Sequence, residues 1–409
     1  MISSSVNAER RTGVSEASGE VAGGATARPE AGGVAEVRPP GGAFVAETTP
    51  DAASGVERTA LLFERQALGC EELGSPFYAG LLRRAAEDVR AGGPCADAVA
   101  GYEQAPGPDA IALRLLGGVH ALVLTGRAPR LAPYYPSAGG TADASRSDAC
   151  WREFRQVVAD ELPWIRDWMT RPPQTNEVGR ANLLIAALLR ASVDHPLPIR
   201  LFELGSSAGL NLRPELFRYS APGYTWGSPD SPVHLDDAWQ GGVPTWLAEA
   251  AESHPTLDVV ERHGCDLTPI DPLTESGALA LRAYVWADQP ARSARLRGAL
   301  ELAARHPAQV QRLGAAEFLK GVHVQDGTLT VVWHSIMKQY VPAQEWAEVS
   351  AELARLAGES SAEAPFAYVS FEPERVGNSF PFRASVRIGT RDRILLAEAY
   401  PHGLPAWAM

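Results

Sequence analysis

The sequence predicts an α/β protein with a doubly wound, largely parallel sheet that ends in an antiparallel hairpin and follows an all-helical region. Three observations predict this class. Apolar residues recur at helical spacing between residues 58 and 191, short apolar strands alternate with helices from residue 199 onward, and the last two strands flank a short turn. Alternating strands and helices are typical of parallel sheets with crossover helices.

The first 57 residues are rich in Ser, Gly, Ala, Pro and Glu and show no sustained hydrophobic period. Such a segment buries too little apolar surface to offset the entropy of the chain, so we expect residues 1–57 to be disordered. We interpret it as a dispensable extension, with a recognition tail as the alternative.

Residues 58–195 are expected to form a helical cap that contributes to substrate binding. Thr59, Ser75-Pro76 and Asp109 are typical helix starts, and each precedes apolar residues at helical spacing. Two further helices are predicted over residues 151–169 and 177–191.

Residues 196–409 are expected to form the sheet domain. The expected elements, in chain order, are strand 199–204, helix 209–217, strand 257–262, helix 291–306, weak strand 310–313, helix 315–321, strand 328–334, helix 343–356, strand 366–371, and hairpin strands 382–388 and 394–399. Residues 221–244 are rich in Pro, Gly and Trp and are read as an excursion from this pattern.

The loop after the first strand is the strongest indication of a ligand site. Glu203 lies at the end of the strand, Gly205 permits a sharp turn, and Gly209 opens the expected helix, whose N-terminal amides favour an anion. Ser207 stands where the dinucleotide fingerprint has its middle glycine, and residues 224–226 lack the ribose-binding acid of NAD enzymes. The spacing E-x-G-x-x-x-G instead resembles the first motif of S-adenosylmethionine-dependent methyltransferases. It therefore predicts a Rossmann-like, methyltransferase-type sheet, with an ordinary packing corner as the alternative.

The ends of two later strands carry further candidates. Asp266 follows the second strand and is placed to hold the ribose hydroxyls of the cofactor, or else to cap its own turn. His334 ends the fourth strand, Lys338 and Tyr340 follow it, and ligands of open α/β sheets bind beyond such ends. His334 is the favoured general base, with Lys338 as another. A bonded His334 at the strand end and a solvated Lys338 are the alternatives.

Four polar residues of the helical region are candidates for substrate binding. Asn176, Glu177 and Arg180 lie at the start of the helix that precedes the first strand, where they can border the site or simply cap the helix. His120 lies among leucines and valines of its helix, so a hydrogen-bonded core histidine is the alternative to a substrate ligand.

Several motifs occur here in one order and resemble a known family. They are residues 204–212, 174–177 with Arg180, 264–272, 285–289 with Arg292, His334-Ser335 with Tyr340, and 401–403. From about Phe63 to Trp407 the chain is similar to the bacterial family known as domain of unknown function 2332 (DUF2332). The resemblance implies a methyltransferase-like core. Lys338 departs from the motifs, and Gly314-Ala315 replace the acid that follows the third strand in methyltransferases, with Glu317 as the nearest carboxylate in sequence.

Composition limits the partners and the location. The 37 basic and 49 acidic residues give a net charge of −12, which argues against general nucleic-acid binding. The four cysteines are far apart and form no CxxC pair, and no apolar run approaches the roughly 20 residues of a membrane span. No second ligand pair has zinc spacing, so no metal is expected. We expect a cytoplasmic protein with a small-molecule substrate, without membrane partners, and with a protein partner or a second copy as further partners.

These observations lead to one leading hypothesis and two alternatives. The leading hypothesis is a small-molecule transferase, most simply an S-adenosylmethionine-dependent methyltransferase, in which Glu203, Gly205 and Gly209 hold the methionine part of the cofactor. The first alternative is a cyclase or lyase on the same fold that uses His334, Lys338 and Tyr340 on a metabolite. The second is a catalytically degenerate, partner-binding subunit, for which the missing third-strand acid is the cue.

Overall fold

The computed structural model describes residues 55–409. The disorder expected for residues 1–57 therefore falls largely outside the described residues, and Gly55, Val56 and Glu57 belong to the first helix. All described residues belong to one compact unit.

The N-terminal region is helical, as the sequence predicts. Its helices are α1 (Gly55–Glu72), α2 (Pro76–Arg90), α3 (Pro94–Val99), α4 (Ile111–Leu124), α5 (Ser147–Asp160) and α6 (Leu162–Met169). The single helix expected over residues 151–169 is two helices, because the chain breaks at Glu161 and Pro163 starts the second one.

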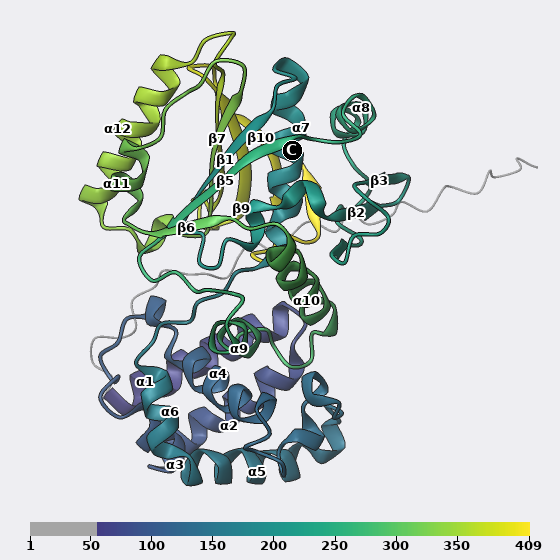
Figure 1. Cartoon of the computed structure of the whole chain (residues 1–409). Helices are drawn as coiled ribbons and strands as arrows, with labels where there is room; N and C mark the ends of the chain where they lie inside the picture. The colour runs from purple at the N-terminus through teal and green to yellow at the C-terminus, as the bar shows by residue number, and fades with distance from the viewer. Residues whose placement is uncertain (1–54) are drawn as a thin grey trace, which may run out of the picture. The chain divides into compact units, whose positions relative to one another are not determined.

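A helix that the sequence reading missed, α9 (Glu275–Ala283), packs against α4 although it lies far along the chain. Figure 1 shows it among the N-terminal helices. Its close approach requires Gly117, because a Cβ there would lie 2.5 Å from the ring of Tyr284. The helical core therefore includes residues from the middle of the chain, such as Trp286.

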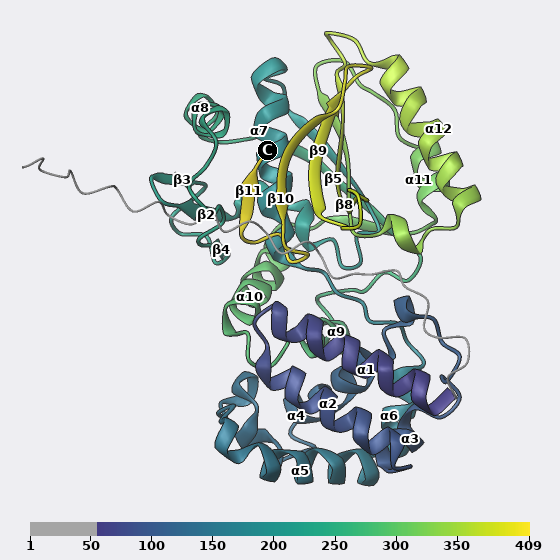
Figure 2. The same cartoon turned by 180° about the vertical axis from the view of Figure 1, so that it is seen from behind.

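The main sheet has eight strands in the order β11-β10-β9-β8-β7-β1-β5-β6. The strands are β1 (Ile199–Leu204), β5 (Val259–Asp266), β6 (Gln309–Arg312), β7 (Leu329–Ser335), β8 (Phe366–Pro373), β9 (Phe382–Ile388), β10 (Ile394–Ala399) and β11 (Ala406–Ala408). Strands β6, β5, β1, β7 and β8 are parallel, and β9, β10 and β11 continue the sheet antiparallel. The end of the sheet is thus three strands (Figure 2) rather than the expected hairpin alone.

Helices cover both faces of this sheet, which explains why its central parallel strands β1, β7 and β8 are mostly buried. One face packs against α7 (Ala181–Asp194), α8 (Thr245–Ser253) and α10 (Pro290–Arg305), and the other against α11 (Ala315–Lys320) and α12 (Ala343–Glu359). Figure 1 shows α11 and α12 on one side of the strands and α7 and α8 on the other. The chain therefore has the mixed α/β architecture that the sequence predicts.

The prediction of a helix over residues 209–217 is wrong. The segment contains only two 3-10 turns, Leu210–Leu212 and Pro214–Leu216. Pro214 lacks the N–H that a continuing helix needs and disfavours helical geometry at Arg213. The anion site expected at that helix N-terminus is consequently absent.

The excursion over residues 221–244 contains a small second sheet that was not predicted. Its strands are β2 (Arg218–Ala221), β3 (Tyr224–Trp226) and β4 (His234–Leu235), in the order β3-β2-β4. Buried aromatic residues such as Tyr219 and Trp226 attach it to the core beside α8.

Two findings in the described residues relate to the expectations drawn from the apolar runs and the cysteines. None of their helices is both long enough and apolar enough to cross a membrane. All four cysteines are buried and unpaired.

Candidate functional site

A cavity of about 450 Å³ lies at the carboxyl ends of β1, β5, β6 and β7. This volume is within the roughly 300–1,000 Å³ range of small-molecule sites. Strand β1 has β5 on one side and β7 on the other, so the cavity includes the point where the strand order reverses, which is where open α/β sheets bind ligands. The helical region supplies the opposite wall through residues 109–114 and 172–180.

Backbone strain is concentrated around this cavity. Four non-glycine residues between 55 and 409 have a positive φ, and three of them line it: Ala110 (φ 50°), Ser207 (φ 52°) and Ile336 (φ 50°). For a β-branched residue such as Ile336 this conformation is a genuine outlier. Each such residue costs on the order of 1–3 kcal/mol, and strain of this kind clusters at functional sites.

The glycine loop forms part of the cavity wall at Gly205 and Ser207. Gly205 has φ +65°, and a Cβ at this position would lie 3.0 Å from Cβ of Met337, so both conformation and space require glycine. Gly209 does not line the cavity. A Cβ there would lie 2.8 Å from Cγ2 of Val310, so Gly209 serves the approach of the neighbouring strand.

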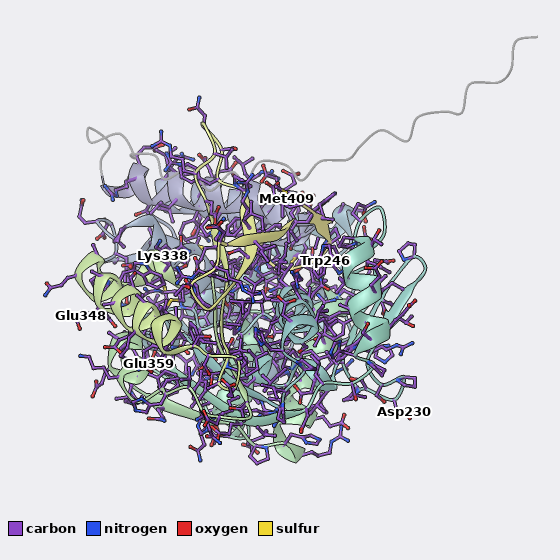
Figure 3. The ribbon with its side chains drawn as sticks, turned by 90° about the horizontal axis from the view of Figure 1, so that it is seen from above. Asp230, Trp246, Lys338, Glu348, Glu359 and Met409 are labelled. Carbon is purple, nitrogen blue, oxygen red and sulfur yellow. The ribbon has the colours of Figure 1, made fainter. Side chains whose placement is uncertain are left out.

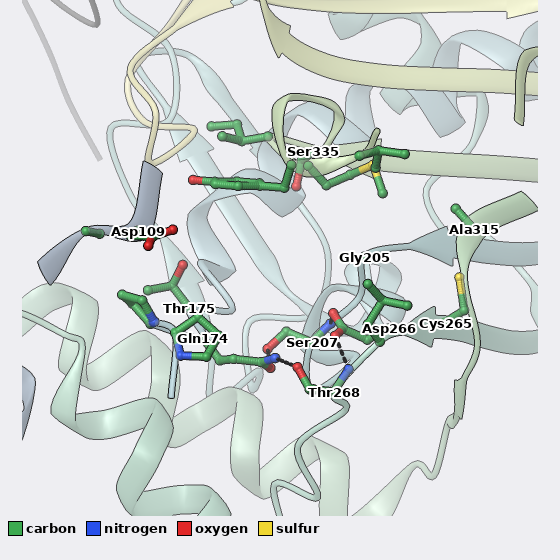
Figure 4. Close-up of a pocket in the computed structure, with 18 of the residues that line it drawn as sticks. Asp109, Gln174, Thr175, Gly205, Ser207, Cys265, Asp266, Thr268, Ala315 and Ser335 are labelled. Atoms are coloured by element: carbon green, nitrogen blue, oxygen red, sulfur yellow. Dashed lines mark hydrogen bonds between the residues drawn. The ribbon is translucent and has the colours of Figure 1, made fainter. Parts of the chain in front are cut away.

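Asp266 is the last residue of β5 and lines the cavity. The backbone N–H groups of Ser207 and Thr268 donate to its two carboxylate oxygens, each at 2.9 Å. The Ser207 hydroxyl donates to Gln174 Oε1 at 3.2 Å, and the Gln174 amide donates to the Thr268 hydroxyl. Figure 4 shows this polar group on one side of the cavity and Ser335 on the other. Asp266 thus fixes the loop and also faces the site.

Arg180 brings a positive charge to the strand-order reversal. It lines the cavity and donates to three neutral oxygens: Nε to the Pro401 carbonyl at 3.0 Å, and Nη1 to the Ser335 carbonyl and hydroxyl at 3.2 and 3.4 Å. It forms no ion pair with any carboxylate in the described part of the chain. The cation is therefore available to an anionic group of a ligand.

Arg114 adds a second cation from the helical wall. It is buried, and its Nε and Nη1 donate to the Asp109 and Met169 carbonyls at 2.7 and 3.0 Å. The Asp109 side chain also lines the cavity and forms no hydrogen bond or ion pair within residues 55–409. Figure 4 shows its carboxylate near Thr175.

Asn176 and Glu177 lie just outside this cavity. The Asn176 Oδ1 accepts from the backbone N–H of Leu210 at 2.8 Å, which ties the start of α7 to the loop after β1. Glu177 is buried and paired with Arg292. Burial alone raises the pKa of Glu177, but the charges of Arg292 and other cations outweigh it and lower that pKa to about 2. Of the three residues expected to border the site from this segment, Arg180 alone lines the main cavity.

Glu203 lies beneath the loop rather than in the cavity. It is 2% exposed, its Oε1 accepts from the Trp333 indole at 2.9 Å, and its Oε2 has no partner. Burial raises the pKa of Glu203 to about 8, because the charged form loses its hydration. The expected contact of Glu203 with a cofactor is therefore not part of the cavity geometry.

His334 is also separated from the cavity. It is 1% exposed, with Nδ1 2.8 Å from Glu372 Oε1 and Nε2 2.7 Å from the Tyr368 hydroxyl. Since both ring nitrogens are engaged, His334 has no free position for a substrate proton. Glu372 Oε1 also accepts from the backbone N–H groups of Met337 and Lys338, at 2.9 and 3.3 Å. The pair thus anchors the turn that forms the cavity wall.

The two other residues predicted to act in catalysis, Lys338 and Tyr340, differ in their relation to the cavity. The Lys338 side chain is exposed and lies over the ring of Trp346, with Nζ 5.1 Å from its centroid. Figure 3 shows Lys338 on the α12 side of the molecule, away from Trp246 and Asp230. Tyr340 is 59% exposed and does line the cavity.

His120 belongs to the helical core, the alternative that the sequence leaves open. Its Nδ1 lies 3.0 Å from the Ala283 carbonyl and its Nε2 2.7 Å from the Ser137 hydroxyl. Burial lowers the pKa of His120 to about 4, so the ring is neutral at pH 7. It is not a residue of the cavity wall.

Sequence reasoning missed Arg114, Asp109 and Glu345 as members of the site. Asp109 ends a 3-10 turn just before α4, Arg114 lies in the first turn of α4, and Glu345 lies in the first turn of α12. Ser335 ends β7 and Ile336 follows it, so both were within reach of the rule that ligands lie beyond strand ends. Among residues 55–409, no group of three His, Cys, Asp or Glu side chains is arranged to hold a metal ion.

Comparison with known proteins gives one family. The model of the family described as "Uncharacterized protein conserved in bacteria (DUF2332)" matches residues 60–407. No curated protein matches the chain, and no solved structure matches it.

Proposed function

Since the chain belongs to the DUF2332 family of bacterial proteins, to whose description no activity is attached, we propose its function from the cavity itself. The protein is a small-molecule transferase of the methyltransferase type that binds S-adenosylmethionine at the carboxyl edge of its sheet.

The observation that carries this proposal is the position of the cavity. Four parallel strand ends meet there at the reversal of strand order, and three of the four strained non-glycine residues line it. Each strained residue costs stability, and strain of this kind clusters at functional sites, which supports a ligand site here.

The residues of the wall fit the two ends of the cofactor. Gly205 and Ser207 leave room for a ligand beside the backbone, and Arg180 supplies the cation that the missing helix N-terminus does not. We therefore assign the cofactor carboxylate to Arg180 and the ribose hydroxyls to Asp266. Bound there, S-adenosylmethionine supplies an electrophilic methyl group.

The substrate is assigned to the helical wall. The Asp109 carboxylate has no partner in the described residues and can accept a proton from a substrate nucleophile, and Tyr340 lines the same cavity. Asp109 replaces His334 in this role because His334 is buried with both ring nitrogens engaged.

Calorimetry and thermal unfolding with S-adenosylmethionine and S-adenosylhomocysteine test the proposal. A ligand at one hundred times its Kd stabilises the folded protein by about 2.7 kcal/mol. Arg180→Met is expected to weaken binding roughly ten- to hundredfold, since hydrogen bonds to charged groups contribute about 1.5–3 kcal/mol. The matched control is Lys320→Ala, an exposed residue of α11. Absence of binding to the unaltered protein at millimolar ligand would overturn the proposal.

One observation favours a second function on the same cavity. Both oxygens of Asp266 already accept backbone hydrogen bonds, and Met337 packs over Gly205, which suits a smaller ligand than a nucleoside. A cyclase or lyase that uses Asp109 and Tyr340 on a metabolite is this second candidate. It predicts a cavity that binds neither cofactor form.

A further inference from the structure

Glu345 brings a carboxylate to the end of β6, where the sequence has Gly314-Ala315. It lies in the first turn of α12 and lines the cavity. Its Oε1 is 2.9 Å from the position that a Cβ at Gly314 would occupy. Gly314 has φ −66° and ψ 153°, which any residue adopts, so the glycine serves space and not conformation. The missing side chain at 314 is what lets the Glu345 carboxylate occupy this place.

Apolar residues line the cavity beside this carboxylate, together with Asp266, whose two oxygens already accept hydrogen bonds from backbone N–H groups. Leu313, Ala315 and Cys265 line the same part of the cavity. Glu345 forms no hydrogen bond or ion pair with any residue in the described part of the chain. A carboxylate accepts hydrogen bonds but donates none, so an unpartnered one in a cavity wall calls for a ligand that presents a donor.

The charges of the cavity also set the direction of a bound ligand. Arg180 lies at the junction of β1 and β7, whereas Glu345 lies beyond β5, at the end of β6. The carboxylate end of S-adenosylmethionine is attracted to Arg180 and repelled by Glu345. With the ribose at Asp266 on the intervening strand β5, the base extends toward β6 and Glu345.

We propose that Glu345 accepts a hydrogen bond from the exocyclic amino group of the adenine, and so makes the cavity selective for an amino-bearing base. This assignment rests on the proposed function. A base with a carbonyl oxygen at the same position places two acceptors against each other, which leaves the Glu345 carboxylate unpaired on binding.

The test compares two ligands by calorimetry on the full chain: S-adenosylhomocysteine and S-inosylhomocysteine, in which a carbonyl oxygen replaces the amino group. The unaltered protein is expected to prefer the adenine ligand roughly ten- to hundredfold. Glu345→Ala removes the preference. Glu345→Gln lowers or reverses it, because the amide can donate to the carbonyl oxygen.

A double variant tests the position of the carboxylate. In Gly314→Asp with Glu345→Ala, an acid just after β6 has its Cβ within 3 Å of the place of the native carboxylate, so the preference for adenine is expected to return. Thermal unfolding of each variant checks folding, which Glu345→Ala should preserve because Glu345 has no partner to lose.

The outcomes separate the two proposals. If neither ligand binds the unaltered protein, the proposed function is wrong and this inference falls with it. If both ligands bind equally, or Glu345→Ala keeps the full preference, cofactor binding stands and the role of Glu345 is overturned.

Discussion

Two nitrogens of Arg292, Nε and Nη2, reach the same oxygen of Glu177, at 2.7 and 2.6 Å. Both side chains are at most 9% exposed, and Glu177 Oε1 also accepts from the backbone N–H of Gly179 at 3.1 Å. The pair joins the start of α7 to α10, directly behind the segment that carries Arg180 into the cavity.

We expect Glu177→Ala to destabilise the fold by about 3–5 kcal/mol, because it leaves the Arg292 charge buried without a partner. Urea denaturation of the purified chain measures this. Glu301→Ala is the control, since Glu301 pairs with Arg305 on the exposed side of α10 and should change stability by no more than about 1 kcal/mol. Equal losses in the two variants would contradict the buried role of Glu177.

The pH dependence of the same pair has a defined sign. The pKa of Glu177 is lowered to about 2 in the fold, from an ordinary value near 4.5. Its stabilisation is therefore complete above pH 4.5 and is lost as the pH falls toward 2. Unfolding between pH 5 and pH 2 should show a smaller loss in Glu177→Gln than in the native chain.

Glu203 predicts the opposite trend at higher pH. Because burial raises its pKa to about 8, folding holds a proton on Glu203 that the unfolded chain releases near pH 4.5. Its contribution to stability is complete below pH 4.5 and falls as the pH rises to 8, by on the order of 1.4 kcal/mol per pH unit at most. Glu203→Gln, which can still accept from Trp333, should flatten denaturation midpoints across this range. Identical pH profiles would rule out a protonated Glu203.

We expect Glu372 to stabilise the turn at Met337 and Lys338, whose backbone N–H groups donate to it. Although its burial works in the opposite direction, the hydrogen bond and charge of His334 lower the pKa of Glu372, so the carboxylate is charged and holds two backbone N–H groups. His334→Ala should lower stability by about 2–4 kcal/mol and speed hydrogen exchange at Met337. Hydrogen exchange read by NMR checks this, with Lys320→Ala as the control. Unchanged exchange at Met337 would show that the turn does not depend on this pair.

Gly205→Ala is expected to weaken ligand binding through both strain and contact. An alanine at φ +65° costs roughly 1–2 kcal/mol, and its Cβ meets Met337 at 3.0 Å. Adding Met337→Ala should recover the part of the affinity lost to contact but not the part lost to strain. Calorimetry of the single and double variants with S-adenosylhomocysteine separates the two. A double variant no better than Gly205→Ala would exclude the steric part.

The alternation of strands and helices could be predicted because it is local: the central strands β1, β7 and β8 are short, largely apolar runs, and the structure confirms the mixed α/β class. The helix predicted at 209–217 does not form, because Pro214 lacks the N–H that a continuing helix needs. The turn at Gly205 and the loop-facing Asp266 followed from strand position.

The remaining parts of the site depend on contacts between distant segments. No local pattern indicates that Glu345 fills the space left at Gly314, or that Arg114 and Asp109 face the strand ends from the helical side. His334 was misplaced for a related reason: it lies on β7, where alternate side chains point to opposite faces, and its partners Tyr368 and Glu372 come from β8.

One wall of the cavity includes the strand ends together with Glu345 of α12, and the other is supplied by residues 109–114 and 172–180, which belong to no strand. Substitutions in the second wall leave every strand residue unchanged. Descendants of a duplicated gene can therefore diverge in the substrates they accept while inheriting the same strand ends, and exchanging residues 109–114 between two such paralogues should transfer substrate preference.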